Sequence, residues 1–161
     1  MESKKAILKK RLFKLERHYE ALKAYKQLID KMTARVDIYL PENFNALKIE
    51  DKAVLDAYLK RFSSVQDFLG AKIFSLLLDV SGIGYGKMSE VLYAIEKEDI
   101  IDSLDHWIEL REIRNELEHD YPDNIVAALK DLKFCIDGFA TLESYYFNVV
   151  RFAERYNHAP S

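Results

Sequence analysis

The stretch "LKRFSSVQDFLGAKIF", from Leu59 to Phe74, repeats apolar residues at intervals of three and four positions. The pattern continues on both sides over about thirty residues, beginning near Asp51, and its members are Leu55, Leu59, Phe62, Leu69, Ile73, Leu76 and Val80. This spacing places apolar side chains on one face of an α-helix. Gln66 lies on the same face. It is either a buried residue with a functional or specificity-setting role, which needs hydrogen-bond partners, or a half-exposed residue at the edge of the face.

The same periodicity predicts further helices on both sides of this stretch. One long helix is expected in the first forty residues, ended by Pro41, with the apolar positions Leu8, Leu12, Leu15, Tyr19, Leu22, Ile29 and Val36. A shorter helix is expected at about 87–98, and another at 103–120, with Asp102 or Ser103 as its N-cap. One final helix is expected with Pro122 in its first turn, with Ile125, Leu129, Leu132, Ile136, Phe139, Tyr146, Val150 and Ala153 on its apolar face and Glu143 interrupting it.

The composition supports an all-α fold. The chain has 161 residues with 49% hydrophobic and 32% charged residues, but only 5 Gly and 3 Pro. That is enough chain for one substantial core, and too few turn markers for a many-stranded sandwich or barrel. We therefore expect a single helical domain over 1–161, an antiparallel up-and-down bundle of four helices with a long N-terminal helix in 1–40 and a core in 50–150.

The charge of the chain is unevenly distributed. Residues 1–31 hold ten Lys and Arg against four Asp and Glu, a net charge of +6, whereas residues 32–161 carry −9. The basic segment is either a solvated helix face or a surface for nucleic-acid phosphates or an acidic partner. The single cysteine, Cys135, is expected to be a buried thiol in a reducing compartment. No apolar segment approaches the ~20 residues that span a bilayer, so we expect a cytoplasmic protein without membrane contact.

The glycine-rich run "SGIGYGK", Ser81 to Lys87, does not match a phosphate-binding loop. That loop needs a glycine where Ser81 stands and a hydroxyl where Met88 stands, and it follows a strand. We interpret the run as a connector that ends the second helix.

The segment "RNELEHDYP", Arg114 to Pro122, is a candidate reaction site. At ~100° per residue, the five steps from Arg114 to His119 leave their side chains about 140° apart around a helix. One interpretation is an ordinary helix end, in which Arg114 pairs with Glu118 on the surface. In the other, Asp120 and the last carbonyls of the helix favour proton uptake by His119, and Arg114 binds phosphate oxygens. A two-fold dimer can bring two histidines and two arginines into one cleft, which meets the minimum for RNA cleavage without a metal.

The spacing of these residues resembles the signature of the HEPN family. Arg114 is followed directly by Asn115, then by His119 and, two residues later, by Tyr121. The segments 59–74 and 103–122 are also similar to HepT-type toxins, a branch also described as nucleotidyltransferase substrate-binding proteins. The likeness covers about residues 50–150.

The resemblance implies a bundle of four or five helices that dimerises and acts as a metal-independent endoribonuclease, the toxin of a toxin–antitoxin pair. It implies that Arg114 and His119 are catalytic, that Asn115 supports the groove, and that a cognate minimal nucleotidyltransferase antitoxin silences the toxin by adding AMP to Tyr121. Arg61 and Gln66 are candidate polar residues of the groove. The alternatives are a noncatalytic subunit that binds nucleotide or substrate for a separate nucleotidyltransferase, and a purely structural helical partner.

No metal site and no cofactor are predicted. His18 and His158 lack a neighbouring pattern of carboxylates and cysteines. His106 is expected to pack near the N-terminus of its helix.

Overall fold

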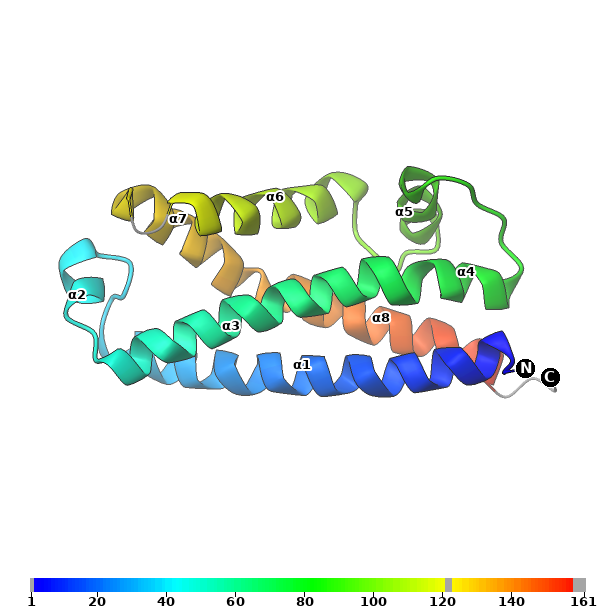
Figure 1. Cartoon of the computed structure of the whole chain (residues 1–161), viewed down its shortest axis with the longest axis horizontal. Helices are drawn as coiled ribbons and strands as arrows, with labels where there is room; N and C mark the ends of the chain where they lie inside the picture. The colour runs from blue at the N-terminus through cyan, green and yellow to red at the C-terminus, as the bar shows by residue number, and fades with distance from the viewer. Residues whose placement is uncertain (1, 121–122, 158–161) are drawn as a thin grey trace.

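The computed structural model describes residues 2–120 and 123–157, except for the side chains of His119, Asp120 and Asn157. Within these ranges the secondary structure is entirely helical, which confirms the all-α class. The elements are α1 (Lys4–Arg35), α2 (Pro41–Asn45), α3 (Ile49–Phe68), the π-helical turn η1 (Leu69–Ile73), α4 (Phe74–Ser81), α5 (Met88–Lys97), α6 (Leu104–Asp120), α7 (Ile125–Asp137) and α8 (Phe139–Asn157). The long helices pack as a bundle, with α3 between α1 and α6 (Figure 1).

Helix α1 forms because its apolar positions follow the predicted stripe. Ser3 caps it by accepting a hydrogen bond from the backbone N–H of Ala6, and the buried face packs against α3 and α8. The helix ends at Arg35, because Val36 is extended and the fully buried Ile38 turns into the core. The prediction that Pro41 ends this helix is therefore wrong. Pro41 instead occupies the first turn of α2.

The stretch 59–74 lies in a nearly continuous helix from α3 through η1 to α4. In η1, a Cβ on Gly70 would lie 3.2 Å from Trp107 Cζ2, so the glycine allows Trp107 to approach closely. The helix ends at Gly82, whose φ of 77° is a left-handed conformation that glycine adopts without strain. The predicted end in the glycine-rich run is confirmed.

Helix α6 is capped by Ser103 rather than Asp102. The Ser103 Oγ accepts a hydrogen bond of 3.0 Å from the backbone N–H of His106. The carboxylate of Asp102 instead accepts hydrogen bonds from the Tyr145 hydroxyl and from His106 Nδ1. Burial alone would raise the pKa of the Asp102 carboxyl, but these hydrogen bonds outweigh burial and hold that pKa below its usual value.

The predicted single final helix is wrong, because the chain bends at Gly138 between α7 and α8. The apolar stripe continues through the bend, so periodicity does not reveal it. A Cβ at Gly138 would lie 3.1 Å from Leu110 Cδ2, and the missing side chain lets the bend pack directly on α6. Helix α7 begins at Ile125, capped by the Asn124 side chain, rather than at Pro122.

Candidate functional site

Arg114 lies on the inner face of α6 and is held by α3. Its side chain is only 8% exposed. Nη1 donates a hydrogen bond of 2.8 Å to the backbone carbonyl of Ser63, and Nη2 forms an ion pair with the Asp67 carboxylate. Nε is buried without a hydrogen-bond partner. The predicted surface pair between Arg114 and Glu118 is therefore wrong, because the guanidinium turns inward and pairs across two helices.

The sequence explains this orientation. Arg114 takes its place in the stripe of α6 between Leu110 and Leu117, both of which are buried. On α3, Ser63 and Asp67 are four residues apart, so they lie one turn apart on the same side of the helix. A planar guanidinium in this position can bond both at once.

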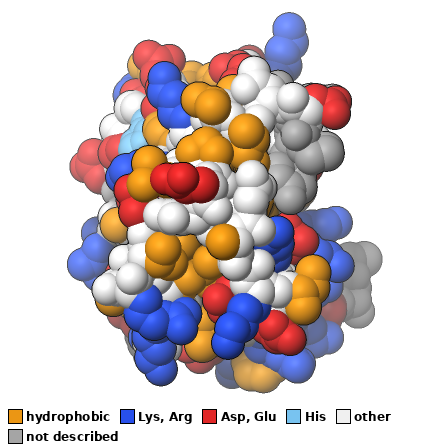
Figure 2. Space-filling model, turned by 90° about the vertical axis from the view of Figure 1, so that its left-hand side faces the viewer, with side chains coloured by type: hydrophobic (Ala, Val, Ile, Leu, Met, Phe, Trp, Pro, Cys, Tyr) orange, Lys and Arg blue, Asp and Glu red, His pale blue; other side chains and the backbone are white. Residues whose placement is uncertain are grey.

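A pocket of about 450 Å³ lies beside Arg114. Its walls come from α2, α3, α6 and α7 and are mainly apolar, with the residues Phe44, Leu55, Leu59, Leu117, Leu129 and Leu132. Charged residues of both signs also line it: Asp56, Lys60, Asp67 and Glu118. Figure 2 views the end of the bundle where α2 and α7 lie, and shows hydrophobic side chains among acidic and basic ones. An anion that enters must compete with Asp67 for the guanidinium.

The other residues of the candidate motif are Asn115, His119 and Tyr121, and of these the structure describes the side chain of Asn115. Asn115 follows Arg114 but is exposed and does not line the pocket. The backbone of α6 continues through His119 to Asp120, but the His119 side chain and the whole of Tyr121 lie outside the described residues. Their predicted roles stay predictions.

Arg61 and Gln66 point to other parts of the molecule. Arg61 faces α1, where its Nη1 lies 2.9 Å from His18 Nδ1. Gln66 is buried, as one of its two interpretations requires. Its Nε2 donates a hydrogen bond of 2.9 Å to the Trp107 carbonyl, and its Oε1 has no partner. Gln66 lines a separate pocket of about 240 Å³ next to Trp107 and Arg111.

Sequence reasoning missed Ser63 and Asp67, which fix the guanidinium. The available signal was a pair of polar residues one turn apart, directly beside the apolar stripe of α3. Matching a cation on the inner face of α6 with a carboxylate on the facing helix would have found Asp67.

The structure also shows the surroundings of two other candidate residues, Cys135 and His106. Cys135 is buried, as predicted, and burial together with Asp131 raises the pKa of its thiol to about 12, although Arg114 opposes the shift. The thiol therefore stays protonated near neutral pH and is no nucleophile. His106 lies near the start of α6, as predicted, and its Nδ1 is 2.6 Å from the Asp102 carboxylate, a contact that the sequence did not indicate.

Comparison of the chain with models of protein families, with curated proteins and with solved structures gives no match in any of the three. The likeness to HEPN proteins thus depends on the residues of the motif and their spacing. No helix in the described ranges is long and apolar enough to cross a membrane. In the same ranges, no group of three or more His, Cys, Asp or Glu side chains is arranged to hold a metal ion.

Proposed function

We propose that the protein is a metal-independent ribonuclease of the HEPN type that acts as a dimer, the toxin of a toxin–antitoxin pair. The observation that supports this proposal best is the anchoring of Arg114 beside a pocket on the helix that also carries His119. Two contacts from α3 fix the guanidinium in a single orientation, and a fixed cation is what stabilises charge that develops in a transition state. In the proposal the fold is an up-and-down HEPN-like bundle of four or five helices.

The reaction requires a base, an acid and a cation. His119 of one protomer takes the proton from the 2′-hydroxyl, and the 2′-oxygen forms a bond to phosphorus. The bond between phosphorus and the 5′-oxygen breaks, and the second His119 gives its proton to the leaving oxygen. Arg114 stabilises the charge on the phosphorane, and Asn115 supports the groove. The products are a 2′,3′-cyclic phosphate and a 5′-hydroxyl.

The dimer is part of the proposal because one helix cannot present both groups together. Residues five positions apart lie about 140° apart around an α-helix. A two-fold axis near the ends of two α6 helices can bring Arg114 of one protomer toward His119 of the other.

Silencing by the cognate minimal nucleotidyltransferase would act at Tyr121. The tyrosine oxygen forms a bond to the α-phosphorus of ATP and loses its proton, and the bond between the α- and β-phosphates breaks to release pyrophosphate. The added AMP brings bulk and negative charge next to the motif, which would block entry of RNA. Intact-mass measurement with that enzyme and ATP is expected to show one adenylyl group on the wild type and none on Tyr121→Phe. Tyr93→Phe, which changes an exposed tyrosine on α5, serves as the control.

The nuclease proposal is tested with purified protein, labelled RNA and a metal chelator. Cleavage that leaves cyclic phosphate ends is expected for the wild type, with a loss of at least about 100-fold in His119→Ala and in Arg114→Lys. Arg114→Lys keeps the positive charge but not the planar fork. His106→Ala and Arg111→Ala change the same residue types elsewhere on α6 and should cleave normally. Undiminished cleavage by both motif variants would show that the site is misassigned.

A second candidate function is the binding of a nucleotide or substrate for a separate nucleotidyltransferase. It is favoured by the pocket itself, because Asp67 already neutralises Arg114 and about 450 Å³ of mainly apolar space lies within the range of small-ligand sites. Calorimetric titration with ATP and AMP tests it. Saturable binding that Leu59→Trp blocks, without RNA cleavage by the wild type, would favour this candidate over the nuclease.

A further inference from the structure

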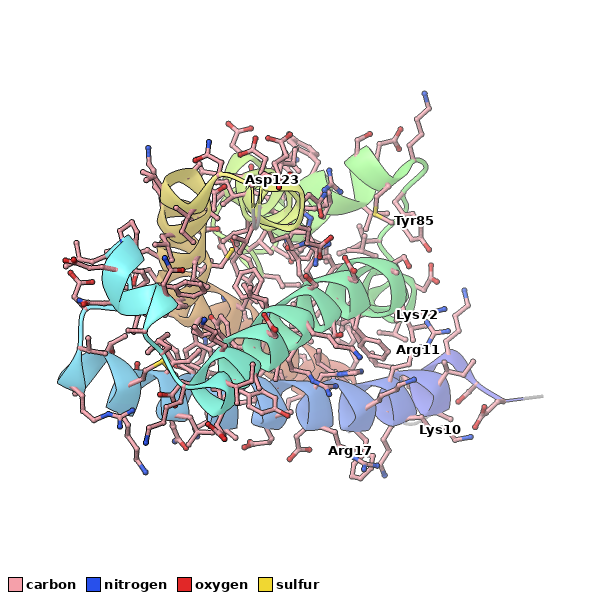
Figure 3. The ribbon with its side chains drawn as sticks, turned by 60° about the vertical axis from the view of Figure 1, so that its left-hand side comes forward. Lys10, Arg11, Arg17, Lys72, Tyr85 and Asp123 are labelled. Atoms are coloured by element: carbon pink, nitrogen blue, oxygen red, sulfur yellow. The ribbon has the colours of Figure 1, made fainter. Side chains whose placement is uncertain are left out.

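Basic side chains gather along the first half of α1, both in its seam with α3 and η1 and on the outer side of the helix. Figure 3 shows Arg11 and Lys72 close together between the two helices, and Lys10 and Arg17 on the outer side of α1. Contacts across the same seam add Lys14, which lies over the Phe68 ring, and Arg61, which meets His18. We call this set the basic flank; its members are Lys10, Arg11, Lys14, Arg17, Arg61 and Lys72.

The basic flank is poorly neutralised by the protein. Among the described side chains, Lys10 is the member that forms an ion pair with a carboxylate, that of Glu2. Arg11 donates to the backbone carbonyl of Lys72 at 2.9 Å, which leaves its charge uncompensated. Further along the same helix the pattern differs, because Lys26 pairs with Asp30 and Arg35 with Asp51.

Among the members of the basic flank, Arg61 shows the lack of a carboxylate partner most clearly. Its Nη1 contacts the nitrogen of an imidazole rather than a carboxylate, and its Nε is buried without a partner. Burial, Arg61 and Lys14 lower the pKa of His18, so this histidine stays neutral and does not add to the positive charge near neutral pH. A partly buried cation without a counter-ion is costly, and an anion from outside would offset that cost.

An exposed aromatic ring lies on the outer side of α1, on the same side of the helix as Lys10 and Arg17. Phe13 is 64% exposed and is the most exposed aromatic side chain among the large hydrophobic residues of the described surface. Three and four residues away on the helix are Lys9, Lys10 and Arg17, together with Glu16, so three cations and one carboxylate flank the ring. Aromatic rings between basic side chains are typical of surfaces that bind single-stranded nucleic acid, where bases stack on the rings and phosphates meet the cations.

We infer that the outer side of α1 within the basic flank binds single-stranded RNA, with phosphates on Lys10 and Arg17 and a base stacked on Phe13, while the cations of the seam add to the positive charge nearby. The chemistry favours RNA over an acidic protein, because a protein carboxylate would use the cations but has no need of the exposed ring. Helix α1 is ~48 Å long at 1.5 Å per residue, so several nucleotides fit along its basic half. This surface does not include the motif of α6, so the inference goes beyond the proposed cleavage reaction and can hold without it.

The inference is tested by fluorescence anisotropy with labelled single-stranded oligouridylate whose 2′-oxygens are methylated. The methyl groups prevent attack by the 2′-oxygen, so binding is measured on the full wild-type chain whether or not it cleaves RNA. Lys10→Ala/Arg17→Ala removes two exposed cations, and the matched control Lys31→Ala/Arg35→Ala removes two from the other end of α1. A third variant, Phe13→Ala, removes the ring without changing the charge.

We expect the double variant of the basic flank to bind about tenfold more weakly than the wild type. The slope of log affinity against log salt concentration is negative, and its magnitude should decrease by about 0.7 for each phosphate that the variant no longer neutralises. The control should stay within about twofold of the wild type, and Phe13→Ala should weaken binding by at least about fivefold. The inference is overturned if the wild type does not bind the oligonucleotide or if the two double variants bind equally well. It is also overturned if polyglutamate binds as tightly as RNA and Phe13→Ala weakens neither, since the surface would then suit an acidic protein.

Discussion

Arg114 on α6 and Arg61 on α3 are treated differently by the fold. Each has a buried Nε without a partner. Arg114 reaches α3 from α6 and finds a backbone carbonyl and a carboxylate, whereas Arg61 projects from α3 toward α1 and finds an imidazole. The protein thus neutralises one cation internally and leaves the other to its surroundings. An external anion must therefore compete with Asp67 for Arg114, whereas at Arg61 it would meet no competing carboxylate.

Among the variants that test this difference between the two arginines, Arg114→Ala is expected to change the free energy of unfolding most. The substitution removes the two interactions with α3 and opens space next to the pocket, so we expect a loss of about 3 kcal/mol in the free energy of unfolding. Urea denaturation followed by circular dichroism measures it. Arg111→Ala, at an exposed position one turn earlier, should cost less than about 0.5 kcal/mol. Equal losses in the two variants would mean that the bonds to Ser63 and Asp67 do not hold α6 to α3.

A smaller loss, about 1 to 2 kcal/mol, is expected for Asp67→Asn. The amide keeps a hydrogen-bond acceptor for Arg114 but not the charge, and the Asp67 side chain is 65% exposed, so water screens part of the interaction. Asp56→Asn changes an exposed aspartate on the same helix and should be nearly neutral. A double-mutant cycle with Arg114→Ala isolates the pair. Additive losses would show that the ion pair contributes nothing measurable.

The contrast between the two arginines shows what could be predicted from the sequence. Periodicity located α1, α3, α5 and α6, and the glycine run correctly ended α4, because both signals are local, whereas the short α2 and the division between α7 and α8 were missed. The partners of Arg114 are 47 and 51 residues away in the chain, so finding them requires α6 to be matched with the polar pair beside the stripe of α3, which periodicity within one helix does not do. Glu143 was visible as an interruption of a stripe, but its acceptance of a hydrogen bond from the Tyr19 hydroxyl depends on how α1 packs on α8.

Gly138 illustrates the same limit for the fold itself. A single glycine within an apolar stripe is compatible with a continuous helix. The bend follows from the close approach of Leu110, which belongs to another helix. For the candidate site, the sequence supplied the motif and its helix, whereas the inward turn of Arg114 and the pocket beside it required the packed structure.

The difference between the two arginines should disappear when Arg61 is also given a carboxylate partner. His18→Glu places an acid where the imidazole now meets the guanidinium, and we expect it to raise the free energy of unfolding by up to about 1 kcal/mol, because the gain from a charge-assisted bond exceeds the cost of a half-buried carboxylate. His18→Gln, which offers an acceptor without charge, should change little. Chemical denaturation at pH 8, where histidine is neutral, gives the cleanest comparison. If the glutamate destabilises the protein, Arg61 is already satisfied in a way that its hydrogen bond with His18 does not reveal.

The smallest expected effect is on the pH dependence of stability, and it comes from His18, the partner of Arg61. Burial, followed by the charges of Arg61 and Lys14, lowers the pKa of His18 below its ordinary value of 6.5. At a pH below 6.5 the unfolded chain therefore binds a proton that the folded chain resists, so His18 favours unfolding increasingly as the pH falls from 6.5 toward its folded pKa. Denaturation curves at pH 7.5 and 5.5 should show a greater loss of stability in the wild type than in His18→Gln, which has no group to protonate at this position. Carboxylates that titrate in the same range affect both proteins equally, so the difference between them isolates the imidazole. Parallel pH profiles would mean that His18 accepts its proton as readily when folded, and Arg61 could not then be an uncompensated cation beside it.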